Sequence, residues 1–275
     1  MTKLSSLHPY KKLGQNFLCD QNVLNKIIDT ISINQESIVL EIGAGSGILT
    51  EPLLRLSKLV VAVEYDRRLV VELNERFKGA LNLKIINKDI LRFDLREFLK
   101  TNEIAEPLVV IGNIPYYITT RIIEYLIENI KFFNNIYLTV QKEYAQRLVA
   151  KVGAKEYSSI SCFIQYFTNP KLCFPIKKTC FRPKPKVDSY FINLAPKDFS
   201  KEPKEFFAHN EKLLFKIINL AFSQRRKKII NALMAIATKE KLVSLLDKVG
   251  IDRSSRAENI SLVEFIRLSN FLDKT

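Results

Sequence analysis

Several residue types are rare in this chain of 275 residues: it has no tryptophan, two histidines and four cysteines. No two cysteines form a C-x-x-C pair, and neither histidine lies near a group of cysteines. A zinc site needs several such ligands at close spacing, so no metal site is expected. Free thiols are typical of a reducing compartment, and we therefore expect a cytoplasmic protein.

Long apolar runs are also missing from the sequence. No stretch approaches the roughly 18 apolar residues of a membrane span, and residues 1–10 contain no apolar signal region. The hydrophobic content of 47% is nevertheless ample for a packed core. These features predict a globular protein that is neither exported nor bound to a membrane, with one large domain and one small one.

Acidic residues are few relative to basic ones. The chain has 29 Asp and Glu against 43 Lys and Arg, which gives a formal net charge of +14. A basic surface attracts polyanions, so nucleic acid is the favoured partner. The alternative is that the source organism has lysine-rich proteins in general.

The pattern of apolar residues predicts an α/β fold. Short β-branched runs at 37–42, 59–63, 83–86, 108–112 and 136–140 alternate with amphipathic stretches. This alternation predicts a parallel sheet with helices on both faces. After a helix around 158–167, two more β-rich runs, at 171–175 and 187–194, are expected to close the sheet as an antiparallel pair.

A change in composition indicates the domain boundary. Residues 196–210 are charged and contain proline, as linkers often do, and the rest of the chain is predicted to form three or four short helices without strands. We therefore expect a first domain over residues 1–195, which carries the motifs described next, and a helical domain over residues 196–275.

Glycine is scarce, with eight residues in all, yet three of them fall in E-I-G-A-G-S-G at positions 41–47. Glycines at the end of a first strand let the backbone turn tightly and approach a ligand. The dinucleotide fingerprint G-x-G-x-x-G would need a glycine at the position of Ile48. The pattern around Gly43 therefore fits a methyltransferase better, and a tight turn without a ligand is the alternative.

Two acidic residues follow the next two predicted strands. Glu64 comes directly after the second strand, where its carboxylate could accept both ribose hydroxyl protons of a cofactor. Asp89 follows the third strand and could accept a hydrogen bond from an adenine amine. Taken singly, each acid is more often a solvated turn residue, but ligands of open α/β sheets bind at these strand ends.

The fourth strand ends in N-I-P-Y at positions 113–116, the most specific motif in the chain. The Asn113 side-chain oxygen and the Ile114 carbonyl could both accept hydrogen bonds from an adenine amine, while the Tyr116 ring stacks on the extruded base. Pro115 would fix the direction of the Ile114 carbonyl, because a residue before proline avoids the helical region. A proline-containing turn without a function is the alternative.

Two basic segments are candidates for RNA contacts. The loop 177–186 contains Lys184 and Lys186, which could bind phosphates, and Phe181, which could pack against a flipped base. Arg225 and Arg226 lie in Q-R-R-K-K at 224–228, on a predicted helix. A purely structural loop and a solvated helix face are the respective alternatives.

These motifs together resemble the ribosomal RNA adenine dimethyltransferase family over nearly the whole chain. K-L-G-Q-N-F-L at 12–18 is similar to the family's opening motif, and further matches lie at 141–143, 181–189 and 256–261. The resemblance implies a class I methyltransferase fold, Rossmann-like with a mostly parallel seven-stranded sheet, and S-adenosylmethionine as cofactor. The cofactor site that it implies consists of Asn16, Leu18, Gly43, Glu64, Asp89 and Asn113.

The C-terminal part, at 222–228 and 250–258, resembles the small-subunit branch of this family. That resemblance implies dimethylation of two adjacent adenosines near the 3′ end of 16S RNA, within a partly assembled ribosomal particle, by a monomeric enzyme. The alternatives are a resistance methylase that acts on 23S RNA and a non-catalytic RNA-binding assembly factor. Tyr117 departs from the family, in which asparagine is common after N-x-P-Y.

Overall fold

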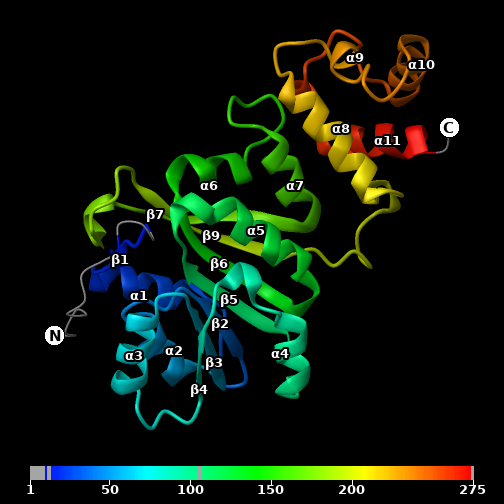
Figure 1. Cartoon of the computed structure of the whole chain (residues 1–275). Helices are drawn as coiled ribbons and strands as arrows, with labels where there is room; N and C mark the ends of the chain where they lie inside the picture. Colours follow the sequence, from blue (N-terminus) through cyan, green and yellow to red (C-terminus); the bar gives the residue numbers. More distant parts are fainter. Residues whose placement is uncertain (1–9, 11–13, 105–106, 274–275) are drawn as a thin grey trace. The chain divides into compact units, whose positions relative to one another are not determined.

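The computed structural model describes residues 10, 14–104 and 107–273. Its main feature is a seven-stranded sheet in the order β4-β3-β2-β5-β6-β9-β7 (Figure 1). The strands are β2 (Ile38–Ile42), β3 (Leu59–Glu64), β4 (Leu83–Asn87), β5 (Leu108–Asn113), β6 (Phe133–Gln141), β7 (Thr168–Ile176) and β9 (Ser189–Pro196). β4, β3, β2, β5 and β6 pair in parallel, and β9 pairs antiparallel with β6. The predicted fold class is confirmed.

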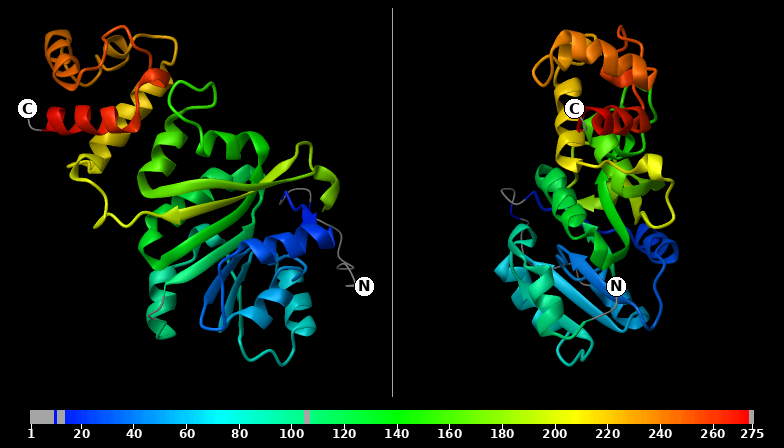
Figure 2. Two further views of the ribbon diagram at one scale, coloured as in Figure 1. Left: turned by 180° about the vertical axis from the view of Figure 1, so that it is seen from behind. Right: turned by 90° about the vertical axis from the view of Figure 1, so that its right-hand side faces the viewer.

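Helices cover both faces of this sheet (Figure 2). The helices along it are α1 (Gln21–Thr30), α2 (Thr50–Leu56), α3 (Arg67–Arg76), α4 (Leu95–Thr101), α5 (Thr119–Glu128) and α6 (Lys142–Leu148). One core joins Leu24, Leu53 and Leu73 from three of these helices to alternate strand residues such as Val60 and Val109. β2 is buried along its whole length, as expected for a strand with parallel neighbours and helices on both faces.

The strand order sets the position of a ligand site. From β2 the chain proceeds outward through β3 and β4 in one direction, and through β5 and β6 in the other. The loops after β2 and β5 therefore diverge, which leaves a crevice at the carboxyl ends of the strands. The glycine-rich loop follows β2, and N-I-P-Y begins at the last residue of β5.

The chain divides into two compact units, and this division corrects the predicted domains. One unit is Met1–Ala145 with Lys171–Pro196, and the other is Gln146–Pro170 with Lys197–Thr275. The chain passes into the second unit for the last time after Pro196, close to the predicted boundary near residue 195. The prediction, however, assigned residues 146–170 to the first domain. They belong to the helical unit because Cys162 and Tyr166 of α7 (Ser159–Phe167) are buried in its core.

The helical unit contains α7 together with α8 (Glu211–Ser223), α9 (Ile229–Ala232), α10 (Lys239–Val249) and α11 (Leu262–Asp273). Its core is built from leucine and isoleucine of these helices, with Phe222 and Phe265 between α8 and α11. Phe163 of α7 packs edge to face on Phe215 of α8, with ring centroids 5.1 Å apart. Within the described ranges, no helix is long and apolar enough to cross a membrane.

Candidate active site

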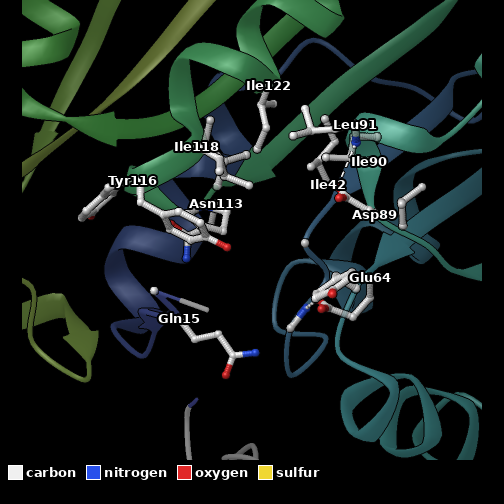
Figure 3. A pocket seen from close by; sticks show the side chains of 18 of the residues that line it. Gln15, Ile42, Glu64, Asp89, Ile90, Leu91, Asn113, Tyr116, Ile118 and Ile122 are labelled. Carbon is white, nitrogen blue, oxygen red and sulfur yellow. Dashed lines mark hydrogen bonds between the residues drawn. The ribbon is translucent and has the colours of Figure 1, made fainter. Parts of the chain in front are cut away.

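A cavity of about 310 Å³ lies at the carboxyl ends of β2, β3, β4 and β5 (Figure 3). Its walls come from the loops after these four strands, from the start of α5 and from residues 14–17. The volume falls in the range of small-molecule sites. Asn16, Gly43, Glu64, Asp89, Asn113, Ile114 and Tyr116 all line it, so the structure brings together seven of the predicted site residues.

The glycine-rich loop needs glycine for its own backbone path. Gly45 and Gly47 have φ of +59° and +78°, in the left-handed region. A Cβ atom on Gly47 would lie 2.6 Å from the Phe77 ring, and one on Gly45 would lie 3.1 Å from Phe17. The loop therefore combines left-handed backbone with close packing, and neither Gly45 nor Gly47 could carry a side chain without strain.

Glu64 is buried, and its carboxylate is held by the backbone. Oε2 accepts a hydrogen bond from the Gly45 N–H at 2.9 Å, and Oε1 accepts one from the Asp66 N–H at 2.8 Å. Burial raises the pKa of Glu64, and these two N–H donors partly oppose that rise. A carboxylate can accept about four hydrogen bonds, so the two oxygens retain capacity for the ribose hydroxyls of a cofactor.

Asp89 lies near Glu64 on the same side of the cavity, beside apolar side chains (Figure 3). One carboxylate oxygen accepts a hydrogen bond from the Leu91 N–H at 3.0 Å and caps the short helix Ile90–Arg92. Figure 3 shows Ile90, Leu91 and Ile122 on this side of the cavity. Apolar side chains with an acceptor at their edge suit an adenine ring that carries an amine, so the residues present fit the adenosine part of S-adenosylmethionine.

The Asn113 amide is oriented by the N-terminal segment. Its Nδ2 donates to the Asn16 carbonyl at 2.8 Å, so its Oδ1 faces the opposite way and is available as an acceptor. Ile114 is buried. The Tyr116 hydroxyl shares a 2.6 Å hydrogen bond with Ser189 of β9, which fixes the ring, and burial raises its pKa.

Glu41, the first residue of the glycine motif, is fully buried behind this site. Its Oε2 accepts a hydrogen bond from the Thr50 hydroxyl at 2.7 Å, while no partner is present for Oε1 among the residues described. Burial, opposed by the Thr50 hydroxyl and supported by the charge of Glu64, raises the pKa of Glu41 to about 7. The side chain is therefore poised to change its charge near neutral pH.

Two predicted site residues occupy the core instead of a ligand surface. Leu18 and Phe181 are both about 2% exposed and face each other in a two-stranded sheet of β1 (Phe17–Leu18) and β8 (Phe181–Arg182). The side chain of Leu18 does not line the cavity, so the expected contact with the cofactor would have to come from its backbone. The prediction that Phe181 packs on a flipped base is wrong for this conformation, because the ring is enclosed. Lys12 and Leu13 of the opening motif lie outside the described residues.

The basic residues are divided between exposed and structural positions. Lys184 and Lys186 are exposed in the loop between β8 and β9. Residues 224–228 form the turn between α8 and α9, which corrects the predicted helix. Arg225 forms an ion pair with Glu258 at 3.0 Å and donates to the carbonyls of Lys155 and Tyr157. It is therefore a structural residue of the helical unit, whereas Arg226 is exposed.

Several cavity residues were not predicted, namely Gln15, Tyr65, Lys88, Tyr117 and Arg121. Tyr65 and Tyr117 are 63% and 62% exposed, so they form the rim. Sequence proximity to Glu64, Asp89 and Asn113 was the available signal for three of them, since a loop that presents one ligand residue presents its neighbours too. Across the described parts of the chain, no group of acidic, cysteine or histidine side chains is suited to a metal ion.

A family model described as ribosomal RNA adenine dimethylase matches residues 8–274. The chain belongs to the ribosomal RNA adenine dimethylase family. The resemblance expected from the sequence is therefore confirmed, and with it an S-adenosylmethionine-dependent methyltransferase.

Relatives named "Ribosomal RNA small subunit methyltransferase A" from Bacillus mycoides (strain KBAB4) and Bacillus cereus (strain AH187) are each 42% identical over 269 residues, 95% of this chain and 90% of theirs. A dimethyladenosine transferase from Plasmodium falciparum superposes with a TM-score of 0.78 at 27% identity, over 94% of this chain and 97% of that one. The 23S rRNA methyltransferase ErmE has a TM-score of 0.70 at 24% identity, over 94% and 100% of the two chains, and shares the fold.

Proposed function

We propose that this adenine dimethylase methylates the N6 amines of two adjacent adenosines near the 3′ end of 16S rRNA. The observation that carries the adenine chemistry is the Asn113 amide, whose Oδ1 is left as an acceptor because Nδ2 is bound to the Asn16 carbonyl. The choice of the small subunit is supported by the relatives at 42% identity, which are named for that subunit.

The chemical task is to make an adenine amine nucleophilic, because its lone pair is delocalised into the ring. When bound, S-adenosylmethionine supplies a methyl group on a cationic sulfur that needs no further activation. Asn113 Oδ1 and the Ile114 carbonyl would accept the amine N–H bonds, two before the first methyl group is added and one before the second, and so draw the lone pair back onto nitrogen. The amine loses one proton for each N–C bond that forms. Tyr116 offers its ring to the extruded base, with its own hydroxyl engaged by Ser189.

The cofactor-binding set in this proposal is Asn16, Gly43, Glu64, Asp89 and Asn113. Two exposed lysines, Lys184 and Lys186, and the exposed Arg226 supply phosphate contacts. Arg225 supports the turn that carries Arg226. We also propose that the enzyme acts as a monomer in the cytoplasm, on a partly assembled small subunit whose shape presents the adenosines.

The experiment compares methyl transfer to small-subunit particles, large-subunit particles and protein-free 16S RNA. We expect transfer to the small-subunit particles, with both adenosines dimethylated. Transfer confined to 23S RNA would reject the substrate in favour of the resistance-methylase activity. Specific RNA binding with no transfer to any of the three would reject catalysis and indicate an assembly factor.

A further inference from the structure

Four consecutive residues, 14–17, contact the chain segments at the ends of three strands, β2, β3 and β5, and we call these four residues the strap. We call the segment 113–117 at the end of β5 the substrate side of the cavity. There the Tyr117 ring packs on Gly14, where a Cβ atom would lie 2.9 Å from Tyr117 Cδ1. The Asn16 carbonyl accepts a hydrogen bond from the Asn113 amide. All of these residues line the cavity.

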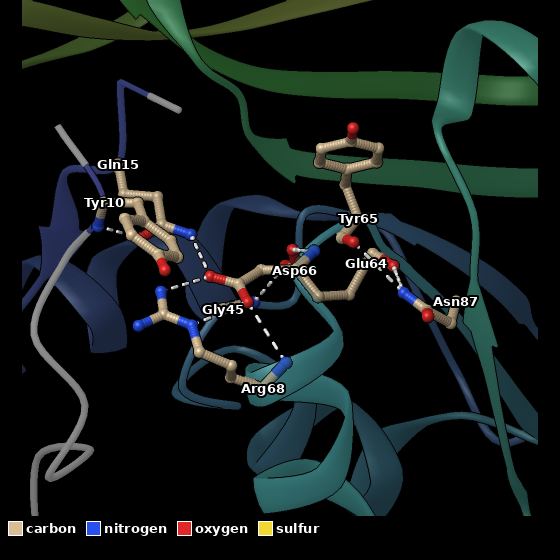
Figure 4. A network of polar contacts seen from close by, with 8 residues as sticks. All are labelled: Tyr10, Gln15, Gly45, Glu64, Tyr65, Asp66, Arg68 and Asn87. Atoms are coloured by element: carbon tan, nitrogen blue, oxygen red, sulfur yellow. Dashed lines mark hydrogen bonds and ion pairs between the residues drawn. The ribbon is translucent and has the colours of Figure 1, made fainter. Parts of the chain in front are cut away.

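We call the loops after β2 and β3 the cofactor side of the cavity, and there the strap contacts Asp66 and the glycine-rich loop. Gln15 Nε2 donates to Asp66 Oδ2 at 3.1 Å (Figure 4), and the Phe17 ring packs on Gly45. The contacts thus alternate between the substrate side and the cofactor side along the strap. A segment bound in this way cannot move at one side without disturbing the other.

Asp66 is the central anchor of the cofactor side, although it does not line the cavity. It is 6% exposed, and its carboxylate is held by Arg68, whose Nε and Nη2 donate at 3.1 and 2.7 Å. This guanidinium lies over the Tyr10 ring, 3.7 Å from its centroid, and the Tyr10 N–H donates to Gln15 at 2.8 Å. The Asp66 N–H also donates to Glu64. The side chain of Asp66 thus binds Arg68, and its N–H binds the Glu64 carboxylate, which we expect to hold the cofactor.

We propose that Asp66 and Arg68 are positioning residues that fasten the strap across the cavity, so that they slow release of the cofactor and hold Asn16 where it orients Asn113. The hydrogen bonds from Arg68 lower the pKa of Asp66, so the carboxylate remains ionised and able to accept from Gln15 at neutral pH. This role rests on the cofactor site and not on the identity of the RNA substrate.

The test compares Arg68→Met with Arg67→Met. Both remove one cation from the first turn of α3, but Arg67 is exposed and outside this network. Stopped-flow displacement of S-adenosylhomocysteine would give the dissociation rate without any RNA. We expect Arg68→Met to raise that rate by roughly five- to tenfold, the size of one lost hydrogen bond, and Arg67→Met to change it by less than about twofold.

Hydrogen exchange at the amides of residues 15–17 provides a second measurement that a direct cofactor contact would not affect. In the apo protein, Arg68→Met should speed exchange there, while the amides of β3 keep their protection. Equal dissociation rates in the two variants would overturn the proposal. Faster exchange with unchanged dissociation would also overturn it, because the strap would then have loosened without releasing the cofactor.

A double-mutant cycle tests whether the two sides act through one segment. Tyr117→Asn removes the ring packed on Gly14, and Tyr117→Phe is its conservative control. If Arg68 and Tyr117 fasten the same strap, Tyr117→Asn should add little to the dissociation rate of Arg68→Met, because the strap is already released. Fully additive effects would show two independent contacts and overturn the coupling.

Discussion

Asn113 is the residue whose loss tests the proposed chemistry most directly, because that chemistry needs its side-chain oxygen as an acceptor. We expect Asn113→Ala to lower the methyl-transfer rate by roughly two to three orders of magnitude, as for loss of one preorganised polar group. Single-turnover rates at saturating cofactor and RNA measure this step. Tyr116→Phe retains the ring and should lose far less, and near-normal chemistry in Asn113→Ala would exclude the acceptor model.

Glu41 offers a prediction about pH. Its pKa in the folded protein, about 7, exceeds the ordinary value of 4.5. The folded state therefore holds a proton that the unfolded state has released, and stability falls as pH rises from about 4.5 to 7. Complete ionisation of Glu41 in the folded protein should lower the free energy of unfolding by at most about 3 kcal/mol, which is the free energy equivalent to this pKa shift.

Glu41→Gln retains an acceptor for Thr50 and cannot ionise. Its free energy of unfolding, measured by urea titration between pH 5 and 8.5, should fall less with pH than that of the native protein. If the free energies of unfolding of the two proteins changed with pH in parallel, the pKa of Glu41 would not be raised by burial and the prediction would be wrong.

Single residues also show what the sequence could predict. Glu64, Asp89 and Asn113 were predictable because strand ends follow from apolar runs, and parallel strands bring their carboxyl ends to one edge. The burial of Phe181 was not predictable, since it depends on pairing with Leu18, which is distant in the sequence. Strands of two residues carry too little periodicity to be recognised.

At the level of elements, the turn between α8 and α9 illustrates two adjacent arginines with different roles. Arg225 reaches the carbonyls of Lys155 and Tyr157 and the carboxylate of Glu258, whereas Arg226 is exposed. We expect Arg225→Ala to destabilise the helical unit by about 1 to 2 kcal/mol and Arg226→Ala to have almost no effect. Thermal unfolding of both variants checks this, and equal midpoints would contradict a structural role for Arg225.

The assignment of α7 to the helical unit could not be predicted from linear composition. A linker was recognisable at residues 196–210 from its charge and proline, but the chain enters the helical unit at residue 146 without such a signal. The cause is tertiary, because aromatic side chains of α7 pack on Phe215 of α8. The parallel pairing of the first strands, by contrast, was predictable from the alternation of apolar runs with amphipathic stretches.

For the whole molecule, the excess of positive charge should determine how the enzyme meets its RNA. Each neutralised phosphate contributes a slope of about −0.7 to −0.9 in log affinity against log salt. Reversing Lys184, Lys186 and Arg226 to Glu should therefore weaken RNA binding across sequences and flatten the salt dependence. Cofactor affinity should stay unchanged, because none of the three residues lines the cavity.

The control for these reversals is Lys100→Glu. Lys100 is exposed in the last turn of α4, and a helix that connects two parallel strands ends at the edge of the sheet opposite the strands' carboxyl ends. It has the same chemistry as the lysine reversals but lies far from the cavity, so its effect on affinity should be small at moderate salt, where exposed charges are screened beyond about 10 Å. Filter-retention measurements of RNA affinity at several salt concentrations distinguish binding to a specific surface from attraction by net charge. If Lys100→Glu weakened binding as much as Lys184→Glu, attraction would come from net charge alone and not from a surface that positions the RNA.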